Sequence, residues 1–166
     1  MTDASEQILK RRAEVLAVTD GLTQVVVTEL VVFRVGGQLA AFRASEVEGA
    51  GRVRELAPVP GGPAWLTGVV QSRGRVLSLV DLNRVWSAPR RGVADQTSYV
   101  VVASGPLRLG VLSEELLGFQ EIETTLVPFE GTDRPGVIEV ARLGADHVLV
   151  LTARRVFQAL GLGDAP

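Results

Sequence analysis

Residues 75–86 read RVLSLVDLNRVW, and residues 147–160 read HVLVLTARRVFQAL. Each segment is a short run of β-forming apolar residues followed directly by a helical pattern. Leu77 and Leu149 occupy equivalent places in the two segments, 72 residues apart. A fixed spacing between similar segments is the mark of an internal duplication. The sequence therefore predicts two related β units.

A candidate β-hairpin precedes each of these segments. Both hairpins consist of β-branched runs on either side of a two-residue turn: VVVTELVVFRV (25–35), Gly36-Gly37 and QLAAF (38–42) in the first half, then SYVVVAS (98–104), Gly105-Pro106 and LRLGVL (107–112) in the second. Ser45-Glu46 after the first hairpin recurs 68 residues later as Ser113-Glu114. Short strands with regular turns favour barrels, because closing a sheet removes its exposed edges.

We therefore expect a mostly β fold with two small barrels that share an apolar interface, since about 70 residues rarely form a stable core alone. Asp81 is placed to cap a short helix after the first barrel, and a C-terminal helix near Ala153–Leu160 should end at Gly161. The expected organisation is an N-terminal helical extension (1–24, with an accessory helix over 3–17) and one domain (25–160), divided into subdomains at about 25–90 and 96–152.

Composition excludes several classes of protein. Of the 166 residues, 46% are hydrophobic and 22% are charged, which allows a buried core, and the net charge of −2 argues against binding to nucleic acid. There is no cysteine, which fits a reducing compartment. No segment approaches the roughly 20 apolar residues that span a bilayer. We expect a cytoplasmic protein without direct membrane insertion.

Residues that would support catalysis or metal binding are sparse. The one histidine, His147, follows a turn and is expected at the surface, and no carboxylates have the spacing of a metal site. Glu121 and Glu123 alternate around Ile122, which is typical of the solvent face of a strand rather than of paired catalytic acids. The glycine-rich segments match no phosphate-binding loop, and GxSxG is absent. We expect no enzymatic activity, no metal and no cofactor.

Residues 56–82, LAPVPGGPAWLTGVVQSRGRVLSLVDL, resemble the signature of the CheW-like chemotaxis coupling family. That signature has a proline-containing loop, an aromatic residue, a Gly-Val pair, an Asn-hydrophobe-Arg-Gly turn and a strand ending in Asp-Leu. The matching positions are Gly68, Val69, Arg73, Gly74, Asp81 and Leu82. LVVFRVGGQLAAF (30–42) and LRLGVLSEELLGFQEI (107–122) resemble the corresponding hairpins, so the resemblance covers roughly residues 30–160.

The resemblance implies a non-catalytic adaptor made of two SH3-like five-stranded barrels. Its partners would be the regulatory domain of a CheA-type histidine kinase and the cytoplasmic tip of methyl-accepting chemoreceptors, which places it in the cytoplasm at receptor arrays. The receptor tip would lie in a groove between the subdomains. The partner-binding positions carried over are Val47, Gly68, Arg73, Gly74 and Gly110.

The chain departs from the family pattern at three places. Gln71-Ser72 replaces the Asn-hydrophobe pair, Ser78 stands where proline is frequent, and Glu48-Gly49-Ala50 removes apolar surface beside Val47. Partner selectivity is therefore expected to be narrower than usual. Packing alone offers a second interpretation of these positions: Val47 as core, the glycines as backbone geometry, and Arg73 as a side chain that covers a neighbouring strand or pairs with a local acid such as Asp81.

Two further functions stay open at this point. A divergent member could retain only one of the two partners, or the cleft between the barrels could bind a small ligand. A nucleic-acid-binding barrel fits less well, because only 5% of the residues are aromatic.

Overall fold

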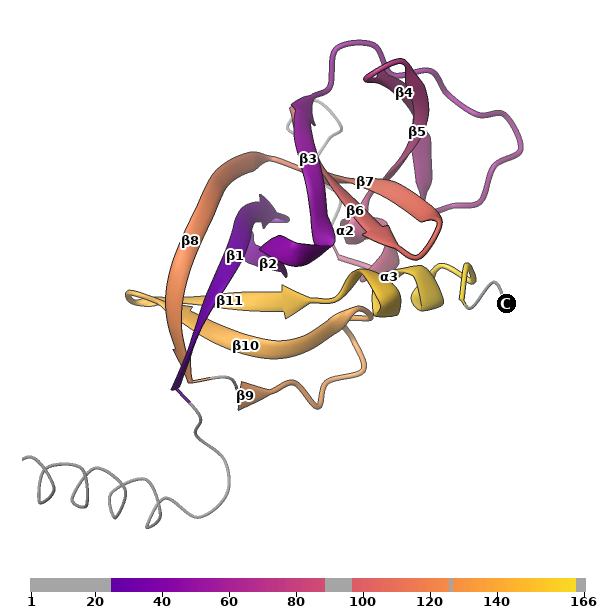
Figure 1. Cartoon of the computed structure of the whole chain (residues 1–166). Coiled ribbons are helices and arrows are strands. Elements are labelled where there is room, and N and C mark those ends of the chain that lie inside the picture. Colours follow the sequence, from indigo (N-terminus) through magenta and orange to yellow (C-terminus); the bar gives the residue numbers. More distant parts are fainter. Residues whose placement is uncertain (1–24, 89–96, 126, 164–166) are drawn as a thin grey trace, which may run out of the picture.

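A computed structural model describes residues 25–88, 97–125 and 127–163. The described chain consists mainly of strands arranged in two sheets, with three short helical segments (Figure 1). The prediction of a mostly β fold is therefore confirmed. The accessory helix expected over 3–17 lies outside the described residues.

The first sheet has six strands in the order β8-β1-β2-β11-β10-β9. Their bounds are β1 Val25–Val35, β2 Gln38–Arg43, β8 Glu115–Thr125, β9 Val127–Pro128, β10 Val137–Leu143 and β11 Asp146–Leu151. The second sheet has five strands in the order β3-β6-β7-β5-β4. Their bounds are β3 Val47–Arg52, β4 Leu66–Ser72, β5 Arg75–Val80, β6 Ser98–Ser104 and β7 Leu107–Ser113. The helical segments are η1 Ala44–Glu46, α2 Leu82–Val85 and α3 Ala153–Ala159.

The two sheets do not follow the expected division at 25–90 and 96–152, because each sheet takes strands from both halves. The hairpin β1–β2 lies beside β11, with Leu39 opposite Val148, and the hairpin β6–β7 lies beside β5, with Gly110 opposite Leu79; both of these pairings are parallel. The chain leaves the six-stranded sheet through η1 directly after β2. The strands that follow, β3 to β5, therefore join β6 and β7 in the five-stranded sheet. In the same way, β8 to β11 of the second half join β1 and β2 in the six-stranded sheet.

The ends of the two helices agree with the expectations from sequence. Asp81 precedes α2, and its side chain accepts a hydrogen bond of 3.0 Å from the Asn83 backbone N–H. Thr152 caps α3 in the same way, accepting from Arg155 N–H. α3 ends before Gly161, whose φ is 74°. In both strand-helix segments of the repeat, the polar residue directly after the strand thus caps the helix that follows.

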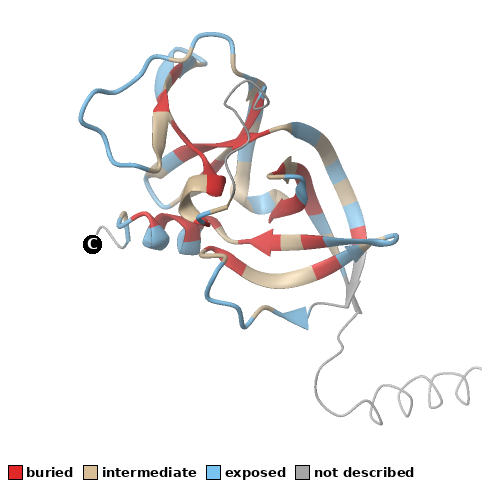
Figure 2. Cartoon of the chain, turned by 180° about the vertical axis from the view of Figure 1, so that it is seen from behind, coloured by how far each residue is buried: buried red, intermediate tan, exposed pale blue. Residues whose placement is uncertain are grey.

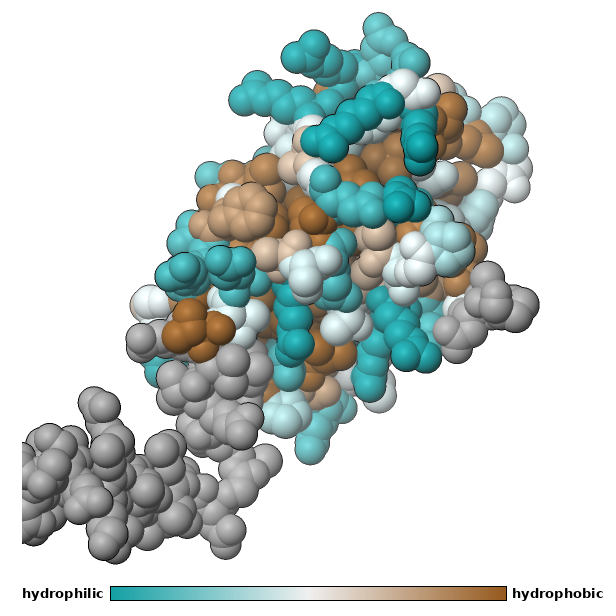
Figure 3. Space-filling model, in the orientation of Figure 1, coloured by the Kyte–Doolittle hydropathy of each residue, from teal (hydrophilic) through white to brown (hydrophobic). Residues whose placement is uncertain are grey.

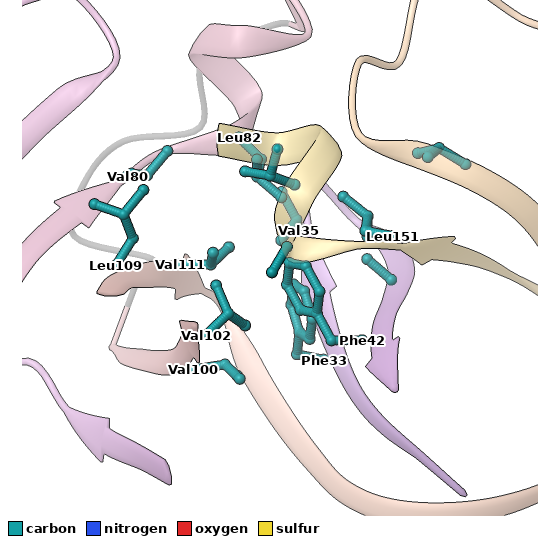
Figure 4. Packing of buried hydrophobic residues seen from close by; sticks show 14 of the residues in the cluster. Phe33, Val35, Phe42, Val80, Leu82, Val100, Val102, Leu109, Val111 and Leu151 are labelled. Carbon is teal, nitrogen blue, oxygen red and sulfur yellow. The ribbon is translucent and has the colours of Figure 1, made fainter. Parts of the chain in front are cut away.

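Buried residues form three clusters. The largest lies between the sheets and includes Phe33 and Phe42, whose rings stack with centroids 5.7 Å apart (Figure 4). Smaller clusters line the inner face of each sheet, around Val32 and Ile122 in one and around Leu79 and Tyr99 in the other. In Figure 2 buried positions gather where the two sheets and α3 face one another.

These clusters explain why the second half of β1, residues 30–35, reads LVVFRV instead of alternating apolar and polar residues. Leu30 and Val32 point into the cluster of the six-stranded sheet, whereas Val31, Phe33 and Val35 point into the cluster between the sheets. A strand buried on both faces carries a nearly continuous apolar run. The apolar interface expected between two β units is thus present.

Glu46 links the crossover between the sheets to the C-terminal helix. It lies in η1, between β2 and β3, and its Oε1 accepts a hydrogen bond of 2.9 Å from the Ala153 backbone N–H at the start of α3. Burial raises the pKa of this carboxyl, although the Ala153 N–H and the nearby Arg43 act in the opposite direction. Its other oxygen, Oε2, is buried and has no hydrogen-bond partner among the described residues. The carboxyl therefore holds two parts of the fold together at some electrostatic cost.

We expect this cost to appear as a pH dependence of stability. The pKa of Glu46 is raised on folding, so the neutral carboxyl stabilises the folded protein. This stabilisation is fully present below the pKa of the unfolded state, about 4.3, and is lost as the pH rises through the pKa of the folded state. Glu46→Gln keeps an acceptor for Ala153 N–H but does not titrate. Chemical denaturation from pH 4 to 7 should therefore show the stability of the native protein falling relative to this variant, by less than about 1 kcal/mol since solvent partly screens the site. The exposed Glu130→Gln is the matched control, and a wild-type curve parallel to that of Glu46→Gln would contradict the assignment.

Candidate functional site

The turn between β4 and β5 presents the sharpest candidate from the sequence. Its central residues, Arg73 and Gly74, have φ of 49° and 75°, and both are exposed. Positive φ at both central residues is the feature of a type I′ hairpin turn, in which Asn and Gly are favoured. An arginine in this conformation costs about 1 kcal/mol of backbone energy. The chain thus retains a charged side chain at a position where the backbone favours other residues.

A buried tyrosine holds this turn in place. Tyr99, on β6, is 6% exposed, and its hydroxyl donates a hydrogen bond of 3.3 Å to Ser72 Oγ. The tyrosine ring lies directly against Gly51 of β3, where any Cβ would overlap the ring. The side chain therefore ties the end of the β4–β5 hairpin to β3 and β6, and the base of Arg73 is rigidly positioned.

The guanidinium of Arg73 extends across to β3. Arg73 Nη2 lies 3.3 Å from the position that a Cβ on Gly49 would occupy. Within the described part of the chain, Arg73 makes no hydrogen bond or ion pair, and the expected local alternative, Asp81, instead caps α2 and pairs with Arg84 at 3.7 Å. Gly49 thus gives Arg73 room to lie over the strand while its donors stay free for another group.

The charge next to Arg73 is set by a neighbouring ion pair. Arg108 Nε and Nη2 donate to Glu48 Oε2 and Oε1 at 2.6 and 3.0 Å, a bidentate geometry that neutralises this carboxylate. A cavity of about 260 Å³ separates these groups and is lined by Arg73, Arg75 and Arg108 as well as Glu48. Because Glu48 is already paired, the cavity retains an excess of positive charge. We call the turn and the facing residues 48–50 the hairpin-tip site.

The other residues carried over from the resemblance lie elsewhere in the five-stranded sheet. Val47 is the first residue of β3 and packs half-buried against the cluster between the sheets. Gly68 and Gly110 are buried within β4 and β7. A Cβ at Gly68 would meet Ala57 O, and one at Gly110 would overlap Leu79 and approach Leu77 Cδ2 to 3.1 Å. The structure brings Arg73 and Gly74 to the surface, while Gly68 and Gly110 permit close packing.

Sequence reasoning missed the arginines that surround the hairpin. Arg52, Arg54 and Arg75 line a larger cavity of about 860 Å³ on the other side of the hairpin. The signal that would have found part of this set is the spacing of Arg52 and Arg54, which differ by two positions. In an extended chain such residues share a face. Arg75 follows a turn, and its place beside them depends on the pairing of β4 with β5.

Within residues 25–88, 97–125 and 127–163, no three side chains among His, Asp and Glu come together as metal ligands. In the same residues, no helix is long and apolar enough to cross a membrane.

Comparison with known proteins gives a consistent family. Residues 29–160 match the model of the CheW-like domain. The chain is 25% identical over 87 residues to the chemotaxis protein CheW of Bacillus subtilis (strain 168), which is 52% of this chain and 56% of that protein. It is 31% identical over 94 residues to the protein FrzA of Myxococcus xanthus, covering 57% and 59%. In each case the chain spans less than two thirds of the relative's length.

A solved structure shares the fold. The scaffolding protein TtCheW of Thermoanaerobacter tengcongensis superposes with a TM-score of 0.68 at 17% sequence identity, covering 76% of this chain and 89% of that one. At this identity the likeness concerns the fold. The arrangement of two interleaved sheets is therefore shared with a protein described as a scaffold.

Proposed function

Because the chain belongs to the CheW-like domain family, we propose that it is a non-catalytic adaptor that couples a CheA-type histidine kinase to methyl-accepting chemoreceptors. It would act in the cytoplasm, at receptor arrays. In this proposal each curved sheet is an SH3-like barrel, and the strands of the five-stranded sheet present the receptor contact. The partner-binding residues would be Arg73 and Gly74 at the surface, with Val47, Gly68 and Gly110 shaping the strands beneath them.

The observation that carries the proposal is the free guanidinium of Arg73 on a rigid turn. A preorganised arginine loses little conformational entropy when it binds, and its planar donors suit a carboxylate. Glu48, the acid in the lining of the same cavity, is paired with Arg108. A partner that supplies a carboxylate to the hairpin-tip site would therefore satisfy Arg73, which has no ion pair among the described residues.

The adaptor proposal is tested by measuring both partners side by side. Full-length protein is mixed with the regulatory domain of a CheA-type kinase from a CheW-containing bacterium, and separately with receptor fragments in membranes, and co-sedimentation is quantified. We expect both to bind, the receptor more weakly than in a family member with a larger apolar residue at the position of Ala50, because apolar anchors dominate such interfaces. Binding to only one partner would identify a divergent adaptor, and binding to neither would reject the proposal.

A small-ligand sensor is less well supported. The space between the sheets is filled by the largest buried cluster. Where α3 meets the β6–β7 turn there is a cavity of about 280 Å³, just below the usual lower size of ligand pockets, roughly 300 Å³.

A further inference from the structure

The second cavity of the five-stranded sheet is an open cleft between two chain segments. Residues 52–57, which follow β3, form one wall, and β4 with the start of β5 forms the other. Its volume is about 860 Å³, and the loop that leads on from residue 57 is exposed along most of its length (Figure 2). We call this cavity the β4 cleft. It lies beside the hairpin-tip site, and its lining shares Arg75 and Val76 with the 260 Å³ cavity of that site.

The β4 cleft exposes an unpaired strand edge. β4 pairs with β5 on one side. On its other side, among the described residues, the backbone pair that spans the cleft is Ala57–Val69, with N–H···O distances of 2.9 and 2.8 Å. In an antiparallel ladder, alternate residues turn their backbone groups to the same side. Since Val69 turns its N–H and C=O toward the cleft, Gln71 does so as well, and among the described residues its backbone groups form no hydrogen bond with residues 52–57.

Positive charge surrounds this edge. Arg52, Arg54 and Arg75 line the cleft, and none of them makes a hydrogen bond or ion pair within the described part of the chain. Glu55 is the single acid in the lining, so the local charge is positive although the whole chain carries −2. Figure 3 shows hydrophilic residues gathered over β3, β4 and β5 with apolar surface between them. Val76 also lines the cleft and is 77% exposed.

We propose that the β4 cleft binds an extended acidic polypeptide segment, which adds a strand to the free edge of β4 at Gln71. Backbone hydrogen bonds to the edge would provide affinity, and side chains on one face of the added strand would meet the arginines while those on the other cover Val76. A nucleic acid fits less well, because no aromatic side chain lines the cleft to stack on bases. Neither the family resemblance nor the hairpin-tip site is required for this inference.

The probe is a fluorescein-labelled peptide of about six residues that alternates glutamate with valine, titrated with full-length protein by fluorescence anisotropy. We expect saturable binding that weakens as salt is added, because solvent-exposed charges are screened. Arg52→Ala/Arg54→Ala should weaken binding about tenfold. Gln71→Pro should weaken it as well, since proline removes the N–H that faces the cleft but leaves the pairing of β4 with β5 intact.

The controls separate charge from strand pairing. Arg142→Ala/Arg155→Ala makes the same change in net charge at two exposed positions of β10 and α3, and should bind as wild type does. A peptide with proline in place of valine keeps the acids but loses the backbone N–H of every second residue and pairs poorly as a strand, so it should bind weakly. Absence of saturable binding to wild type, or equal binding by the cleft variants and the control variant, would overturn the proposal, as would competition by a single-stranded oligonucleotide that binds more tightly than the peptide.

The outcome is independent of the adaptor assay. The cleft variants keep Arg73, so they test the β4 cleft without altering the hairpin-tip site. If the cleft variants lose peptide binding but still co-sediment with kinase and receptor, the β4 cleft is a surface separate from the partner contacts. If the wild-type protein binds neither kinase nor receptor but still binds the peptide, the adaptor proposal fails and the proposal for the β4 cleft stands.

Discussion

Replacing Gly110 by valine should lower the free energy of unfolding by about 2–3 kcal/mol. Gly110 lies at the centre of the five-stranded sheet, opposite Leu79 of β5 and Val101 of β6. A Cβ there would overlap Leu79, which is completely buried, and would come within 3.1 Å of Leu77 Cδ2. The surrounding side chains are closely packed, so the added carbon atoms would have to displace them.

Thermal and urea unfolding of the variant measure this cost, with Gly49→Ala as the matched control. Gly49 also lies in a strand of the five-stranded sheet, but a Cβ there meets only the flexible end of Arg73. We expect the control to stay within about 0.5 kcal/mol of wild type. Partner association of Gly110→Val should fall only in step with its folded fraction. Normal stability combined with lost association would instead favour the direct partner contact that the family resemblance implied.

The fold was largely predictable because local signals agreed with one another. The glycine turns, the β-branched runs and the strand-helix repeat all indicated paired hairpins, and Asp81 and Thr152 cap the helices where the polar residue follows each strand. The exchange of strands between the halves was not predictable. Leu39 and Leu79 would be equally well buried whether their strands paired within one half or between the halves, as observed. An internal repeat presents the same apolar face to strands of its own half and to strands of the other half.

The candidate site was predictable in part. Arg73 was identifiable because an arginine beside a turn glycine has no evident place in a core. The role of its surroundings depended on contacts between residues far apart in sequence, such as Arg108 with Glu48 and Tyr99 with Ser72. Gly110 could not be assigned from sequence, because a glycine required for close packing and one required for partner contact look the same until the neighbouring side chains are known.

Replacing Arg73 by glutamate should weaken receptor association by about 2 kcal/mol or more. The substitution removes the free donors of the hairpin-tip site and places a second carboxylate near Glu48, whose own charge is held by Arg108. A receptor carboxylate would then meet repulsion in place of hydrogen bonds. Stability should change by roughly 0.5 kcal/mol or less, because Arg73 is exposed and makes no ion pair within the described residues. Melting temperature and receptor co-sedimentation, measured on the same preparation, report the two effects.

Two companion variants make the result for Arg73→Glu interpretable. Arg142→Glu reverses the same charge at an exposed position near the β10–β11 turn, so any general effect of net charge on sedimentation appears there too. Arg73→Lys keeps the charge but cannot bind a carboxylate in bidentate fashion, and should lose part of the affinity. If the site acts through geometry and charge together, affinity falls in the order wild type, Arg73→Lys, Arg73→Glu, while Arg142→Glu equals wild type. A lowered melting temperature for Arg73→Glu with unchanged receptor association would mean instead that Arg73 serves only to cover β3 at Gly49.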